Sequence, residues 1–398
     1  MNNFPENLEH KLNARKQNLS FRELPLVNSL IDFSSNDYLG FSKRETIFDE
    51  THQYLINKNL KINGATGSRL ISGNHELYQE TESFIANFHD SESALIFNSG
   101  YDANIGFFGC VPQRNDIILY DELCHASIRD GILMSNAKSY KFNHNDFENL
   151  DLRIKNLKLK IKNIEIAYND NTTDNGNTTI FYIVTESVFS MDGDCPNLEE
   201  LVRVCEKHNC LLVVDEAHAL GVIGENGQGL VQEHKFQDKI FARIMTFGKG
   251  LGCHGAAILG SQNLKYYLVN FARSFIYTTG LSPHSVATIL IAYQHLSKDK
   301  TEVEKLQENI IYFNQHKNLL SLKPLFVRSK SAIQSAIIPG NEKVKNIAKI
   351  IQDKGFNVKA ILSPTVPEGQ ERLRICLHSY DSKEDISEVL ILLSNFVF

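Results

Sequence analysis

The sequence lacks several features that define particular classes of protein. It has no run of about eighteen apolar residues that could span a membrane. Its start, MNNFPENLEHKLNARKQ, is polar and contains no apolar signal-peptide core. The seven cysteines are scattered without a C-x-x-C pair, which argues against a zinc site and against a disulfide framework. We therefore expect a cytoplasmic protein with reduced thiols, no bound metal and no membrane partner.

A phosphate-binding loop is also missing, which decides how the string CLLVVDEAHALG at residues 210–221 is interpreted. Its DEAH tetrad is typical of the magnesium-binding strand of a helicase, but such a motor needs G-x-x-x-x-G-K-[ST] ahead of that strand. The only Gly-Lys pair, Gly248-Lys249, follows the strand, and Gly250 occupies the Ser or Thr position. A net charge of −6 offers no basic surface for a polyanion. We therefore exclude a helicase and expect no nucleic-acid partner.

The composition is that of an ordinary globular protein. Of 398 residues, 42% are apolar and 22% are charged, which allows a sizeable core. The middle of the chain alternates short apolar runs with amphipathic stretches; the runs are SALIFNSG, DIILYDE, SYKFNH, IFYIVTES, CLLVVDEAH, IMTFGKG and AAILGS. Stretches such as 75–89 and 197–209 carry apolar residues at helical spacing. This alternation predicts an α/β fold with a mostly parallel sheet flanked by helices.

Three segments are expected along the chain. Residues 1–49 form an N-terminal segment and 50–285 a large domain. Residues 286–398 form a smaller α+β domain, with helices expected at 288–296, 303–316, 342–355 and 385–398 and strands within SAIQSAIIP and ERLRICLH. The stretch NDNTTDNGNTT at 169–179 has no apolar residue and is expected to be a surface loop. No internal repeat appears.

Polar residues gather where the expected strands end. Ligands in open α/β sheets bind outside the carboxyl ends of the strands. The residues that follow these strands are Ser99, Gly100, Tyr101, Asp121 to His125, Glu186, Ser190, Asp215, His218, Thr246 and Lys249. Each has an ordinary explanation when taken alone, as a cap, a turn former or a solvated loop residue. Their joint occurrence in this order favours a functional site.

These side chains match the needs of pyridoxal 5'-phosphate. Its aldehyde requires a lysine as a Schiff base, and Lys249 lies between two glycines that leave room for the ring. Asp215 can keep the pyridine nitrogen protonated, so that the ring acts as an electron sink. His125 can stack on the ring. Ser99, Gly100 and Tyr101 begin an expected helix, whose N–H groups suit the phosphate.

Longer strings give the chain a family resemblance. They are IDFSSNDYLGFS, GATGSRLISGNHELY, FNSGYDAN, DELCHASIRDGI, TESVFSMDGD, VVDEAHALGVIGENGQG, TFGKG and PTVPEGQERLR. Together they resemble the α-oxoamine synthases, fold-type-I pyridoxal-phosphate enzymes, over nearly the whole length. Members of this family are acyltransferases that join an amino acid to an acyl thioester and release carbon dioxide.

The resemblance implies a role for each matched residue. The implied catalytic residues are Lys249, His125 and Asp215. The implied cofactor-binding residues are Gly100, Tyr101, His125, Glu186, Ser190, Asp215, His218, Thr246, Lys249, Thr278 and Thr279. The implied substrate-binding residues are Arg22, Asn36, His125, Thr365 and Arg374. Within the last set Arg374 is the expected clamp for the amino acid's carboxylate.

The resemblance also implies substrates and partners. The strings LNARKQNLSFRE and SPTVPEG are similar to those of members that condense L-alanine with a pimeloyl thioester for biotin synthesis. The thioester could be carried by coenzyme A or by an acyl carrier protein, which is then a possible partner. Glycine-using and serine-using members share the same cofactor residues and stay as alternatives. A non-catalytic binding module is disfavoured, because it needs no complete set of Lys249, Asp215 and His125. Homodimers with shared active sites are expected, in which Thr278 or Thr279 reaches the partner's phosphate.

Overall fold

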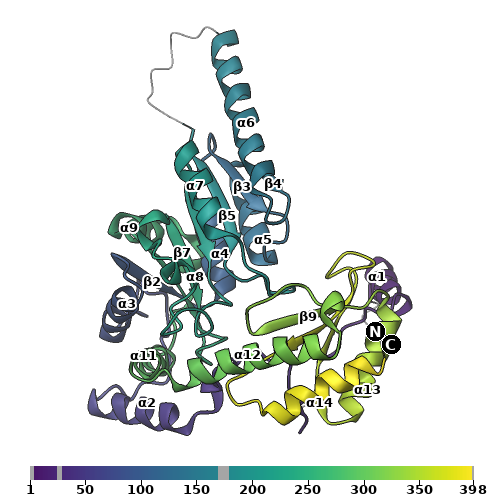
Figure 1. The fold of residues 1–398 in the computed structure, drawn as a ribbon. Coiled ribbons are helices and arrows are strands. Elements are labelled where there is room, and N and C mark those ends of the chain that lie inside the picture. Colours follow the sequence, from purple (N-terminus) through teal and green to yellow (C-terminus); the bar gives the residue numbers. More distant parts are fainter. Residues whose placement is uncertain (1–3, 25–28, 169–178, 397–398) are drawn as a thin grey trace. The chain divides into compact units, whose positions relative to one another are not determined.

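The structure is a computed structural model that describes residues 4–24, 29–168 and 179–396, so the loop expected at 169–179 lies almost entirely outside the described residues. The chain forms two compact units (Figure 1). The large unit comprises Leu39–Phe189 and Cys195–Val303. The small unit comprises Met1–Tyr38, Ser190–Asp194 and Glu304–Phe398. Each unit is described by itself.

The large unit is built on a seven-stranded sheet in the order β2-β8-β7-β6-β5-β3-β4. The strands are β2 (Ser93–Phe97), β3 (Ile117–Asp121), β4 (Lys138–Phe142), β5 (Phe181–Glu186), β6 (Leu211–Asp215), β7 (Ala242–Thr246) and β8 (Ala256–Gly260). Strand β8 runs opposite to the other six, and it pairs antiparallel with β2 and β7. The carboxyl ends of β3, β5, β6 and β7 therefore lie at one edge of the sheet.

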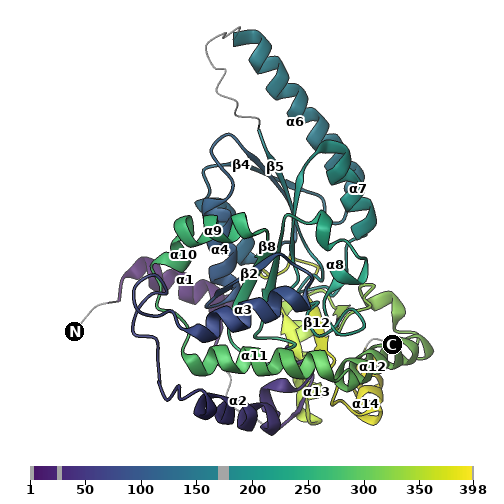
Figure 2. The same cartoon turned by 90° about the vertical axis from the view of Figure 1, so that its left-hand side faces the viewer.

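Helices cover both faces of this sheet. The helices of the large unit are α2 (Glu45–Asn57), α3 (Glu76–Phe88), α4 (Gly100–Cys110), α5 (Ala126–Met134), α6 (Phe147–Tyr168), α7 (Leu198–His208), α8 (Leu230–Glu233), α9 (Gln262–Phe271), α10 (Arg273–Ile276) and α11 (Pro283–Lys298). Figure 2 shows α4 and α9 on one side of the strands and α6 and α7 on the other. Successive strand residues point to opposite faces, so Val213 packs with α4 and α9 while Leu212 and Val214 pack with α6 and α7.

Local sequence explains why α7 forms where it does. Leu198, Leu201, Val202 and Cys205 are buried on one face, as the helical spacing of 197–209 predicted. At the start, the Asn197 side chain accepts a hydrogen bond from the N–H of Glu200, which satisfies one of the amides that a helix leaves unpaired. The helix therefore has a sharp beginning and a buried face that holds it against the sheet.

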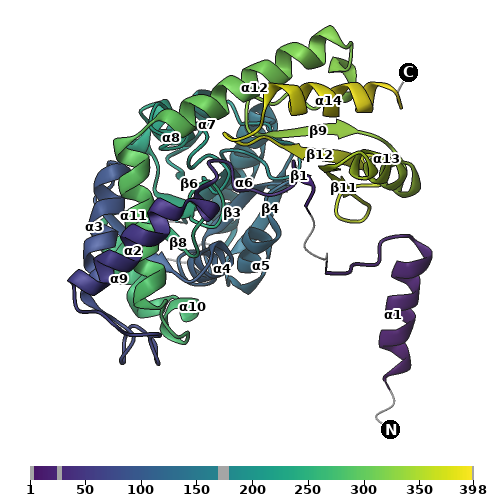
Figure 3. The same ribbon diagram turned by 90° about the horizontal axis from the view of Figure 1, so that it is seen from below.

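The small unit contains a three-stranded antiparallel sheet in the order β11-β12-β9 and a short parallel pair, β1 with β10. Its strands are β1 (Ile31–Asp32), β9 (Ile333–Ile337), β10 (Phe356–Asn357), β11 (Lys359–Ile361) and β12 (Arg372–Cys376). Its helices are α1 (Glu6–Gln17), α13 (Asn341–Asp353) and α14 (Lys383–Ser394), and α12 (Thr301–Leu319) begins in the large unit. Figure 3 shows α13 and α14 beside β9, β11 and β12. This is the α+β arrangement expected of the C-terminal segment.

None of the helices in the described residues combines the length and the apolar character that crossing a lipid bilayer requires.

Candidate active site

Four of the predicted polar residues stand at the carboxyl edge of the large sheet. Asp121 ends β3, Glu186 ends β5, Asp215 ends β6 and Thr246 ends β7. Glu186 and Asp215 are paired in register on neighbouring parallel strands. Parallel strands bring their last residues to the same side of a sheet, which explains why residues far apart in sequence meet here.

The Asp215 carboxylate is held by two hydrogen bonds. Its Oδ1 accepts from the N–H of Ala217 at 2.9 Å, and its Oδ2 accepts from Asn104 Nδ2 at 3.0 Å. Asp215 is 5% exposed and Asn104 is 2% exposed. A fixed carboxylate in this buried position can stabilise a protonated ring nitrogen. Asn104 was not among the residues predicted from the sequence.

His125 is the N-cap residue of helix α5, and both its backbone and its ring form hydrogen bonds. Its N–H donates to Glu186 Oε1 at 2.5 Å, and its ring Nδ1 lies 2.8 Å from Ser127 Oγ. Burial lowers the pKa of His125, Asp215 opposes that change, and the positive charge of Lys249 adds to it. The lowered pKa favours the neutral form of the His125 ring. Burial and the charge of Asp215 raise the pKa of Glu186 to about 8.

Lys249 lies in the loop that follows β7, between Gly248 and Gly250. A Cβ on Gly250 would lie 2.3 Å from the carbonyl oxygen of Leu220, in the segment that also carries the buried His218. Gly250 is therefore needed for close packing of the two loops. The charge of Lys249 acts on both His125 and Glu186, so its side chain shares their surroundings.

The start of α4 has the features of a phosphate site. Ser99 caps the helix by accepting the N–H of Asp102, and the first-turn amides of Gly100 and Tyr101 have no acceptor within the helix. A Cβ on Gly100 would lie 2.5 Å from Thr246 Cγ2, so the helix start closely approaches the end of β7. The Tyr101 hydroxyl donates to Asp130 at 2.7 Å.

Thr278 and Thr279 lie in the same unit, next to this helix start. Asn98 Nδ2 donates to Thr278 Oγ1 at 3.2 Å and to the carbonyl oxygen of Thr279 at 2.6 Å. Gly280 then donates its N–H to the carbonyl oxygen of Gly67. The loop that carries both threonines is therefore fixed to the segment preceding α4. Their predicted contact with a partner subunit's phosphate stays a prediction.

The large unit thus supplies each kind of group that pyridoxal phosphate needs. Asp215 would supply the anion, Lys249 the amine, His125 the flat ring and the start of α4 the donors for the phosphate. Asn104 Oδ1 is a buried oxygen without a hydrogen-bond partner in the part of the chain described. Its amide instead turns its NH₂ group toward Asp215 Oδ2 and Ser127 Oγ. The residues present fit the cofactor.

Apart from His125, the predicted substrate residues lie in the small unit, in two groups. Arg374, on β12, is 6% exposed; its Nε donates to the carbonyl oxygen of Ser190 at 2.8 Å and its Nη2 to Asn36 Oδ1 at 3.0 Å. Arg22 Nη2 donates to Thr365 Oγ1 at 3.3 Å. Ser190, predicted to bind the cofactor, is therefore placed beside Arg374, and its role stays a prediction.

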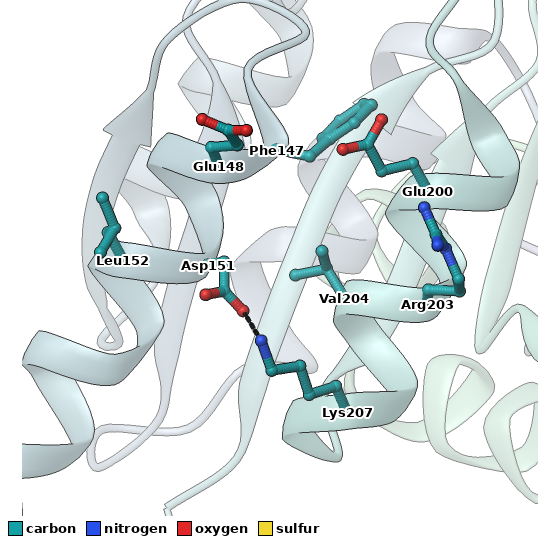
Figure 4. A pocket seen from close by; sticks show the side chains of 8 residues that line it. All are labelled: Phe147, Glu148, Asp151, Leu152, Glu200, Arg203, Val204 and Lys207. Atoms are coloured by element: carbon teal, nitrogen blue, oxygen red, sulfur yellow. Dashed lines mark hydrogen bonds and ion pairs between the residues drawn. The ribbon is translucent and has the colours of Figure 1, made fainter.

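A surface hollow lies elsewhere, between α6 and α7 (Figure 4). An ion pair of 2.6 Å between Asp151 and Lys207 crosses it, and Asp151 also pairs with Lys155 and His208. The contacts with Lys207 and His208 join α6 to α7 on one face of the sheet. Among the described residues no group of three or more His, Cys, Asp or Glu side chains could hold a metal ion.

Comparison with known proteins assigns the chain to a family. The family model described as aminotransferase class I and II matches residues 28–390. An 8-amino-7-oxononanoate synthase from Emericella nidulans is 38% identical, covering 97% of this chain and 94% of that protein. A putative 8-amino-7-oxononanoate synthase from Methanococcus vannielii is 34% identical, covering 96% of each.

Solved structures agree with this assignment. The 8-amino-7-oxononanoate synthase of Francisella tularensis has a TM-score of 0.74 at 28% identity, covering 93% of this chain and 98% of that one. A serine palmitoyltransferase of S. paucimobilis with bound PLP has a TM-score of 0.85 at 23% identity, covering 99% and 98%, and shows the shared fold. The predicted fold-type-I architecture is confirmed. The chain therefore belongs to the aminotransferase class I and II family, and within it to the α-oxoamine synthases, the pyridoxal-phosphate-dependent acyltransferases that its sequence motifs predicted.

Proposed function

We propose that this protein condenses L-alanine with a pimeloyl thioester to give 8-amino-7-oxononanoate, carbon dioxide and the free thiol, as a step of biotin synthesis. The observation that carries the proposal is the 34–38% identity to proteins of that name over almost the entire chain. Pyridoxal phosphate supplies the electron sink for the carbanion that attacks the thioester.

Four residues of the chain have separate proposed roles in this reaction. Lys249 holds the cofactor and then removes the α-proton of alanine, a general-base step worth about 10²–10⁴ in rate. Asp215, fixed by Asn104 and Ala217, keeps the ring nitrogen protonated. His125 stacks on the ring and assists the loss of carbon dioxide. Arg374 binds the amino acid's carboxylate, for which a planar guanidinium is better suited than an ammonium group.

We propose a homodimer as the working form and either coenzyme A or an acyl carrier protein as the thiol. The support for a dimer is the pair Thr278 and Thr279, which the resemblance assigns to the partner subunit's phosphate. A cytoplasmic location, the absence of a nucleic-acid partner and the segment boundaries near residues 49 and 285 also stay predictions.

Product analysis tests the proposal. The purified protein is supplied with pyridoxal phosphate, one amino acid at a time (L-alanine, glycine or L-serine) and pimeloyl-, acetyl- or palmitoyl-coenzyme A. We expect the mass of 8-amino-7-oxononanoate with L-alanine and the pimeloyl thioester. A clear preference for glycine with the acetyl thioester, or for serine with the palmitoyl thioester, would replace the proposal by a sister reaction of the same family.

A further inference from the structure

Two buried residues outside the predicted set connect His125 to Asp215. Asn104 lies on α4 and Ser127 on α5, and they are 2% and 1% exposed. Asn104 Nδ2 donates to Asp215 Oδ2 and to Ser127 Oγ, each at 3.0 Å. Ser127 Oγ in turn lies 2.8 Å from His125 Nδ1. The four side chains form a continuous hydrogen-bonded chain inside one unit.

We propose that Asn104 and Ser127 are positioning residues, which hold His125 as the neutral tautomer whose proton is on Nε2. The expected effect on catalysis rests on the role proposed for His125 in the reaction. The tautomer itself follows from the contacts and can be measured without cofactor or substrate.

The direction of each hydrogen bond follows from Asp215. An ionised carboxylate only accepts hydrogen bonds, so the amide of Asn104 must turn its NH₂ group toward it. The second N–H of that group then points at Ser127 Oγ. Rotating the amide by half a turn would place Oδ1 against the carboxylate, a repulsive arrangement. The observed orientation leaves Asn104 Oδ1 buried without a partner among the described residues, so the contact with Asp215 outweighs that loss.

Ser127 transmits this orientation to the imidazole. A hydroxyl has one proton, and because Ser127 Oγ accepts from Asn104, its proton is available for His125 Nδ1. The N–H of Ser127 also points at Nδ1, at 3.2 Å, as the first-turn cap of α5. Two donors therefore converge on Nδ1. A proton on that nitrogen would face both of them, which leaves Nε2 as the protonated atom of the neutral ring.

As a consequence, each ring nitrogen of His125 has a defined hydrogen-bonding role. Nδ1 accepts from Ser127, and only Nε2 can donate to a substrate or cofactor group. The charged groups that change the pKa of the ring are Asp215, Lys249, Arg129 and Asp130, on β6, α5 and the loop after β7. Glu186 accepts from the backbone N–H of His125. None of these five residues is hydrogen-bonded to Nδ1 in the described structure.

The test is nitrogen NMR on cofactor-free protein with ¹⁵N-labelled histidine, in which the His125 signals are identified by their loss in His125→Gln. In the wild type we expect Nε2 protonated and Nδ1 unprotonated. Ser127→Ala removes one of the two donors, so the Nδ1-protonated form should grow and the pKa of His125 should rise. The change in the acid dissociation constant should be about two- to ten-fold, as expected for one neutral hydrogen bond.

Two matched variants separate positioning from packing. Ser135→Ala makes the same chemical change at the other end of α5, where Oγ donates to the carbonyl of Pro112 and accepts from the N–H of Ala137, and should leave the His125 signals unchanged. Ser127→Thr keeps the hydroxyl and should preserve the wild-type tautomer. In the assay, Ser127→Ala should move the acidic limb of the kcat profile to higher pH with little change in KM for L-alanine.

A wild-type His125 protonated on Nδ1 would overturn the inference outright, even if Ser127→Ala did not fold. An unchanged tautomer and pKa in a folded Ser127→Ala protein would overturn it as well. Neither result depends on which amino acid or thioester the enzyme uses, so failure of this inference is distinguishable from failure of the proposed reaction.

Discussion

At the residue scale, the site depends on hydrogen-bond partners that fix the orientation of its functional side chains. Lys249, Asp215 and His125 could be chosen from the sequence because each is a chemically distinctive residue at a strand end. Asn104 and Ser127 could not, because a buried amide four residues into a helix and a serine in another helix look like ordinary structural residues. Only the folded distances of 3.0 Å to Asp215 and between the two residues reveal their place in the site.

Arg374 gives a residue-scale prediction. Arg374→Lys keeps the positive charge but loses the planar pair of donors, so kcat/KM for L-alanine should fall by about 10- to 100-fold, the range for a charge-assisted hydrogen bond. Steady-state kinetics at varied L-alanine measure this, with the exposed Arg328→Lys of the same unit as the control. If both substitutions changed kcat/KM for L-alanine equally, Arg374 would not be the residue that binds the carboxylate.

At the element scale, the apolar pattern predicted most of the architecture. Strands such as β6 are apolar along their whole length because both faces of the sheet are covered, and that pattern is visible in the sequence. The order of the strands was not visible. Adjacent strands β5 and β3 are separated in sequence by β4 and α6, and β8 inserts antiparallel between β7 and β2. Such long-range pairings depend on how helices fill the faces, which a local pattern does not encode.

Helix α12 provides an element-scale prediction on pH. Burial, followed by the charge of Lys323, lowers the pKa of Lys317 to about 8 from its ordinary value of 10.5. The unfolded chain therefore binds more protons than the folded one between pH 8 and 10.5. The contribution of Lys317 to the free energy of unfolding should rise with pH across that window.

Urea unfolding of the wild type and of Lys317→Met at pH 8 and at pH 10.5 measures this contribution. The stability of the wild type relative to the variant should increase at the higher pH. The exposed Lys349→Met of α13 serves as the control and should show no such trend. A stability difference that is the same at both pH values would mean that Lys317 titrates normally.

At the scale of the whole molecule, the proposed shared active site can be tested by mixing subunits. Lys249→Ala and the double variant Thr278→Ala/Thr279→Ala should each be nearly inactive. If the threonines belong to the partner's site, a mixed dimer has one intact site. That site combines Lys249 of the threonine variant with Thr278 and Thr279 of the Lys249→Ala subunit. Random mixing should then restore about a quarter of wild-type activity. No recovery on mixing, despite proven subunit exchange, would place the threonines in their own subunit's site.

The central claim is that Lys249 holds pyridoxal phosphate and gives it up to L-alanine. The most direct measurement is the visible absorption spectrum of the purified protein while L-alanine is added, compared with Lys249→Ala and with the exposed Lys298→Ala. We expect a cofactor absorption band that shifts on addition of L-alanine in the wild type and in Lys298→Ala. Lys249→Ala should start from a different spectrum, because it has no lysine at position 249 to bind the cofactor covalently. The proposed role of Lys249 would be wrong if the wild-type protein stayed colourless after incubation with pyridoxal phosphate. It would also be wrong if Lys249→Ala gave the same spectra as the wild type before and after addition of L-alanine.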